Sequence, residues 1–147
     1  MTPDPATSPV AARAQARWIA LLAAIGAWTA LVPYFAKLIG LRVDVPGRVE
    51  VVDHVVPGIV IAALAGWLAW RARSGPVLGT TAAGIVGGVC FLAGFWVAAT
   101  HVPLIRDAAD ARESWGAALW HASTALPILA ISLWMLFASG SGENGRA

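Results

Sequence analysis

Residues 77–105 read VLGTTAAGIVGGVCFLAGFWVAATHVPLI and contain no Asp, Glu, Lys or Arg. A helix crosses the hydrocarbon core of a bilayer with about 20 mostly apolar residues, and this single run is long enough to do so. The composition of the whole chain also indicates a membrane protein, because 59% of its residues are hydrophobic, 12% are charged and the mean hydropathy is +0.72. A soluble domain carries about 25% charged residues. The sequence therefore predicts an integral membrane protein.

Three further apolar runs have the same character, and they cover 18–41, 49–70 and 115–138. The polar segments 42–48 and 71–76 contain Pro and Gly, which predict turns between the runs. The charged, Ala-rich segment 106–113 is expected to extend the fourth helix beyond the membrane. We therefore predict an all-α fold, an antiparallel bundle of four transmembrane helices over residues 18–138.

The four runs divide into two copies of one helix pair, repeat one at 18–71 and repeat two at 77–138. The tails at 1–17 and 139–147 are expected to be disordered. Because each copy has an even number of spans, both copies enter the membrane in the same direction, and a pseudo-two-fold axis along the membrane normal follows. At an offset of 67 or 68 residues the aligned positions are Gly26-Ala27-Trp28 with Gly94-Phe95-Trp96, His54 with His121, and Trp67 with Trp134.

The first copy carries a series of short motifs: Gly26-Ala27-Trp28, then Pro33-Tyr34, then Asp53-His54-Val55-Val56-Pro57-Gly58. This series resembles the helix pair of the SPW-repeat membrane proteins of bacteria. There a Gly-x-Trp stretch ends in a Pro-aromatic corner, and a polar residue precedes a Gly-led apolar helix. Val32-Pro33-Tyr34 replaces the Ser-Pro-Trp signature, and the second copy departs further with Thr100-His101-Val102-Pro103. The resemblance implies a tandem two-helix repeat and no particular activity.

Small residues and prolines suggest how the helices pack. Gly84 and Gly88 form a GxxxG motif, which in membranes lets helices approach closely. We expect it to pack inside the bundle, with self-association of two chains as the alternative. Pro57 and Pro127 lie within helical runs and are expected to kink them.

All three histidines map to one side of the membrane, with Asp53 at a similar depth. Polar groups at membrane depth usually face the bundle interior or a water-filled space. His54 and His121 are therefore candidate haem ligands, and His54, His101, His121 and Asp53 are candidate ligands of a transition metal. A His with a nearby Asp can also relay protons. The other reading is structural, with each ring bonded to a backbone carbonyl or a lipid headgroup.

Several function classes are excluded or disfavoured. The lone Cys90 excludes an intramolecular disulfide and CxxC motifs. No basic cluster indicates nucleic acid, and no catalytic constellation stands out, so an enzyme is the less favoured class. We expect an accessory or protein-interaction module that binds another membrane protein. The alternatives are a haem- or metal-binding redox protein and a transporter subunit that acts as an oligomer.

The composition also bears on location. It is rich in Ala, Gly, Val, Trp and Arg and has a single Lys, which is typical of a bacterium with GC-rich DNA. We therefore expect a bacterial plasma membrane. Basic residues divide equally between the two sides, but Arg13 and Arg17 directly precede the first span, which usually dominates orientation. Cytoplasmic termini are expected.

Overall fold

The computed structural model describes residues 9–38, 47–112 and 114–140, and all regular structure in these stretches is helical. Four helical stretches are long and apolar enough to cross a membrane. This confirms the number and character of the predicted spans. They are Ala12–Phe35, Gly47–Arg71, Thr81–Ala109 and Ala118–Ser139.

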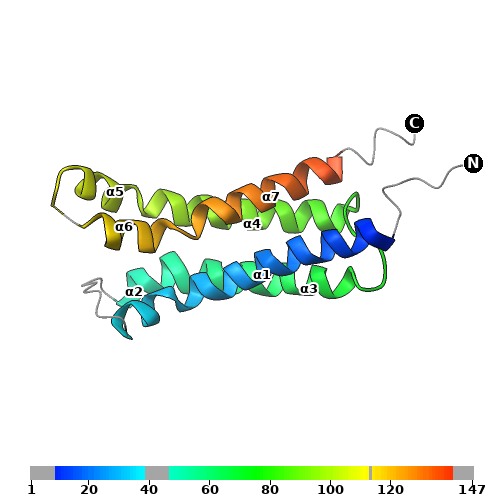
Figure 1. The fold of residues 1–147 in the computed structure, drawn as a ribbon, viewed down its shortest axis with the longest axis horizontal. Helices are drawn as coiled ribbons and strands as arrows, with labels where there is room; N and C mark the ends of the chain where they lie inside the picture. Colours follow the sequence, from blue (N-terminus) through cyan, green and yellow to red (C-terminus); the bar gives the residue numbers. More distant parts are fainter. Residues whose placement is uncertain (1–8, 39–46, 113, 141–147) are drawn as a thin grey trace, which may run out of the picture.

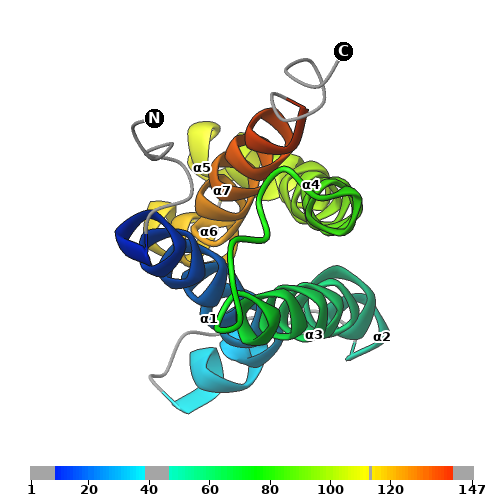
Figure 2. The same cartoon turned by 90° about the vertical axis from the view of Figure 1, so that its right-hand side faces the viewer.

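Only the first span is one uninterrupted helix, α1 (Pro9–Leu38). The others are each built from consecutive pieces: α2 (Gly47–Glu50), η2 (Val51–Val55) and α3 (Val56–Arg71); α4 (Thr81–Thr100) and α5 (Val102–Ala109); α6 (Trp115–Ala122) and α7 (Ala125–Gly140). Successive spans run in opposite directions along the long axis (Figure 1). Seen end-on, α1, α3, α4 and α7 follow one another around a ring (Figure 2).

Glycines bring α1 and α3 into backbone contact. A Cβ on Gly58 would lie 2.5 Å from the backbone nitrogen of Ala30, and a Cβ on Gly26 would lie 2.7 Å from that of Ala62. Lipid tails are as apolar as the helix surfaces, so close packing at small residues is what draws membrane helices together. In the second pair, a Cβ on Gly94 of α4 would lie 2.6 Å from the side chain of Ile128 on α7.

Prolines account for the breaks within the spans. A helical Pro has no N–H for the carbonyl four residues back, and its ring clashes with that carbonyl. Pro57 is preceded by the π-helical turn η2, in which the Val56 N–H bonds to the carbonyl of Val51. Pro103 follows the break between α4 and α5 at His101. Pro127 follows the interruption at residues 123–124, so the expected kink is a break between α6 and α7.

The ends of three spans differ from their sequence-based positions. α1 begins at Pro9, inside the segment assigned to the N-terminal tail. α4 begins at Thr81, because the Thr80 side chain caps it by accepting from the N–H of Ala83 at 3.2 Å. The prediction for 106–113 was wrong in its first half, since residues 106–109 belong to α5 and continue the third span. The positive φ of 57° at Ala111 prevents α5 from continuing into α6. α7 ends at Gly140, so residues 139–140 of the expected C-terminal tail are helical, and the rest of that tail lies outside the described residues.

Candidate functional site

Two histidines from different helix pairs meet at the end of the bundle that carries α2 and α5. Nε2 of His54, in η2, lies 3.1 Å from Nε2 of His101, at the end of α4. Their ring centroids are 4.7 Å apart and the ring planes are tilted by 67°. Both side chains are buried, at 3% and 4% exposure. This contact joins positions 47 residues apart in the sequence.

Backbone contacts set the tautomer of this pair. Nδ1 of His101 lies 2.6 Å from the carbonyl oxygen of Val97, which can only accept, so Nδ1 carries a proton. The Thr100 hydroxyl lies 3.2 Å from the same nitrogen. In the neutral ring, Nε2 of His101 is then the acceptor, and Nε2 of His54 donates to it. Two rings both protonated at Nε2 could not keep this contact.

The backbone around each histidine explains why the two rings lie against each other. The π turn at 51–55 adds backbone ahead of Pro57, and π turns inside helices are frequent at functional sites. His101 sits at the C-cap of α4, where its N–H bonds to Ala98 and the helix stops before Pro103. Both histidines therefore occupy interruptions that a proline imposes on its span.

A small cavity of about 160 Å³ adjoins the pair. It is lined by the two rings together with Val49, Glu50, Asp53, Thr100 and Leu104. Pockets for drug-sized ligands measure roughly 300–1,000 Å³, so this one is sized for a few waters or an ion. A porphyrin does not fit between rings whose Nε2 atoms are in hydrogen-bond contact, because two axial imidazoles need about 4 Å between their nitrogens.

The structure brings together two of the four residues proposed as metal ligands and places a third, Asp53, on the wall of the same cavity. The side chain of His121 is not among those that the structure describes. The distance between the rings of His54 and His121 therefore falls outside the described part of the chain as well. In the parts of the chain that the structure describes, no three His, Cys, Asp or Glu side chains are grouped closely enough to hold a metal ion. The sequence analysis grouped His54 and His101 in one candidate site but did not single out their direct contact. The only signal was a proline close after each histidine, at Pro57 and Pro103.

The cysteine contributes nothing to this site. Cys90 is fully buried in the middle of α4, among apolar neighbours of the core. Comparison with protein-family models, with curated proteins and with solved structures found no match.

Proposed function

We propose that this chain is a non-catalytic module of a bacterial plasma membrane, built from two tandem helix pairs, which binds one transition-metal ion between the pairs at His54 and His101. The observation that carries the proposal is the pair of buried imidazoles with facing Nε2 atoms 3.1 Å apart. Buried ionisable residues at membrane depth are rare and usually functional.

Three features of the pair suit a metal. Two imidazoles that bind one tetrahedral ion at about 2.0–2.1 Å have nitrogens roughly 3.3 Å apart, so the present separation would change by only a few tenths of an ångström. His101 donates its other ring N–H to the Val97 carbonyl, which is the usual orienting contact of a metal-binding histidine. The adjoining cavity leaves room for water to complete the coordination. Binding requires His54 to move its proton from Nε2 to Nδ1, with no net release.

Burial at equivalent positions supports the tandem repeat. At an offset of 68, buried Leu22 of α1 corresponds to buried Cys90 of α4, and at 67, buried Ile61 of α3 corresponds to buried Ile128 of α7. The close contact of Gly26 with Ile61 recurs as that of Gly94 with Ile128. Further matches in burial are Thr29 with Val97, Ala65 with Ser132, and Leu68 with Met135.

In the same alignment, the contact between His54 and His101 has no counterpart related to it by the pseudo-two-fold axis. Position 101 corresponds to Pro33, so repeat one has no equivalent of His101. A His54–His101 contact therefore requires both repeats and cannot form twice. A buried polar contact without a counterpart in the repeat favours a function over a by-product of duplication.

The outer surface of the bundle bears on whether the chain binds another protein. Lipid accounts for the exposed apolar side chains of the spans, so these do not by themselves mark a protein partner. Gly84 and Gly88 both face α7, where Cβ atoms would lie 3.7 Å from Ser139 and 3.9 Å from Leu136. That arrangement supports packing within the bundle over self-association. With termini on the cytoplasmic side, the metal faces the outer leaflet, where a partner membrane protein could receive it.

The test is metal binding by the detergent-purified full chain with a tag that contains no histidine. The protein is dialysed against Zn²⁺ or Co²⁺, and bound metal is measured by mass spectrometry and by the visible absorption of Co²⁺. We expect one equivalent per chain, and its loss in His54→Gln and His101→Gln. His121→Gln shows whether the third histidine also contributes.

The fold of each variant is checked by the unfolding temperature without metal. Failure of the wild-type chain to bind more metal than the His54→Gln/His101→Gln double variant would overturn the proposal. The pair would then be an N–H···N bond that fastens the two helix pairs, a contact worth about 0.6–1.7 kcal/mol in membranes.

A further inference from the structure

The two ends of the bundle differ in charge. The carboxylates among the described residues all lie at the histidine end, on α2, η2, α5 and the turn after it; they are Glu50, Asp53, Asp107 and Asp110. The opposite end, where α1 begins and α3 ends, carries four arginines and no described carboxylate (Figure 1). These arginines are Arg13, Arg17, Arg71 and Arg73.

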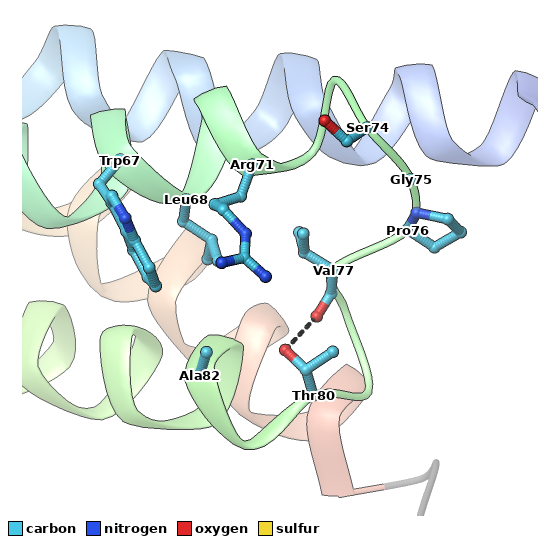
Figure 3. Close-up of a pocket in the computed structure, with 9 residues that line it drawn as sticks. All are labelled: Trp67, Leu68, Arg71, Ser74, Gly75, Pro76, Val77, Thr80 and Ala82. Atoms are coloured by element: carbon cyan, nitrogen blue, oxygen red, sulfur yellow. Dashed lines mark hydrogen bonds between the residues drawn. The ribbon is translucent and has the colours of Figure 1, made fainter.

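The arginines border two hollows on either side of the loop between α3 and α4. The larger, about 620 Å³, is lined by α1 and by the loop, with Arg13, Arg17 and Arg73 on its wall. The smaller, about 220 Å³, contains Arg71 and Thr80. Figure 3 shows Trp67 and Arg71 projecting from the last turns of α3 towards the start of α4. Residues 74–76 line both hollows, so one short loop separates them.

The guanidinium groups at this end have no acidic counterpart in the described chain. The described ion pairs join Arg112 at the other end to Asp107 and Asp110, at 3.8 and 3.5 Å. The guanidinium carbon of Arg71 lies over the ring of Trp67, 5.7 Å from the ring centroid. Four like charges held around concave surfaces repel one another, and an anion placed between them relieves that repulsion.

We infer that this arginine-lined end binds the phosphate of an anionic phospholipid headgroup, held between Arg13 or Arg17 of α1 and Arg73 of the loop. Guanidinium groups bind phosphate oxygens in bidentate geometry. Basic pockets between membrane helices are known to take lipid headgroups.

A lipid is favoured over a soluble phosphate by what surrounds the arginines. Trp18 follows Arg17 directly and is 51% exposed, and Trp67 and Trp70 near Arg71 are 43% and 62% exposed. Exposed indoles at the ends of spans mark the level of the headgroups. Ala12, Ala16 and Pro76 line the larger hollow beside the arginines, giving the glycerol and acyl portion an apolar wall. The site lies at the opposite end from the histidines, so its success or failure is independent of the metal.

The experiment measures lipid retained by the full chain. Protein in detergent is mixed with equal amounts of phosphatidylglycerol and phosphatidylcholine, and bound lipid is counted by native mass spectrometry. The test variant is Arg13→Gln/Arg73→Gln. The matched control is Arg106→Gln/Arg112→Gln, which removes the same net charge from the other end.

We expect the wild-type chain and the control to prefer phosphatidylglycerol, and the test variant to lose at least fivefold of that preference. Equal losses in both double variants would show that net charge alone attracts the lipid and would overturn the site. Equal retention of phosphatidylcholine would do the same. A parallel arm adds inorganic phosphate, and displacement of the lipid at millimolar phosphate would reassign the site to a soluble anion.

Discussion

Replacing Gly58 with Ala tests the tightest of the glycine contacts among the described residues. The new methyl would lie 2.5 Å from the Ala30 nitrogen, 2.7 Å from the Gly26 carbonyl oxygen and 2.9 Å from the Ala30 Cα. All three atoms belong to the backbone of α1, so no side-chain rotation removes the overlap. α1 would have to move away from α3 by most of an ångström to reach ordinary contact distance.

Two opposing terms set the size of the effect. Overpacking of this kind costs about 1–3 kcal/mol, and an unyielding backbone places it near the upper end. A gap of 0.5–1 Å along the rest of the crossing also forfeits a quarter to a half of the dispersion energy there. Ala favours the helix over Gly by about 1 kcal/mol. The clash therefore exceeds the propensity gain, and we expect a net loss of about 2 kcal/mol.

Cys90 provides the assay, because it is the only cysteine and is fully buried. A maleimide that becomes fluorescent on reaction with a thiol reports its exposure as the detergent-solubilised protein is heated. At roughly 4 °C per kcal/mol for a chain of this size, the midpoint of Gly58→Ala should fall by about 8 °C.

Gly66→Ala is the control on the same helix. A Cβ there would meet only Ala23 at 4.0 Å, which is ordinary contact, so the helix propensity gain should leave the midpoint unchanged or higher. If Gly58→Ala melts at or above the wild-type temperature, the backbone contact between α1 and α3 is not as close as described, and the glycine-based account of the first helix pair is wrong.

Three further predictions concern other parts of the chain. Thr80→Ala removes the cap of α4 and should destabilise by about 1 kcal/mol in the same melting assay, whereas Thr81→Ala, whose side chain is not the cap, should change little. Ala111→Gly should stabilise the folded chain by about 0.5–1 kcal/mol, because glycine adopts φ of 57° without strain. Ala109→Gly, within α5, should destabilise it, and equal effects of the two substitutions would refute the argument. A Ser74→Cys variant should resist a membrane-impermeant maleimide applied to intact cells and react after permeabilisation, if the termini are cytoplasmic as their arginines predict; labelling from outside would reverse the topology.

The spans were predictable from sequence, but their interruptions were only partly so. Apolar length alone identified four crossings, and the structure contains four helices of that kind. Pro57 and Pro127 indicated where two spans deform. The form of each deformation, a π turn before Pro57 and a break before Pro127, depends on which backbone hydrogen bonds replace those that the proline removes. The segment 106–113 was misassigned because a charged, Ala-rich stretch can extend either helix that it joins.

At the candidate site, what the sequence predicted and what the structure added are easier to separate. The sequence placed the histidines at similar depth and favoured an inward ring for His54, which is buried; the burial of His101 comes from the structure. The sequence did not identify which rings meet. Repeat symmetry drew attention to His54 and His121, whereas the described contact pairs His54 with His101. A one-residue difference in helix register rotates a side chain by about 100°, so depth alone cannot select a partner.

The sequence by itself determined the all-helical class and the four stretches that are long and apolar enough to cross a membrane. These follow from local properties, because the bilayer demands a fixed length of apolar residues and a helix satisfies its backbone hydrogen bonds within itself. Only the tertiary structure decided that η2 faces the end of α4, and that four arginines surround two hollows at the other end. Those arrangements depend on the rotation and spacing of helices about one another, which close contacts at Gly26, Gly58 and Gly94 set across distant parts of the chain.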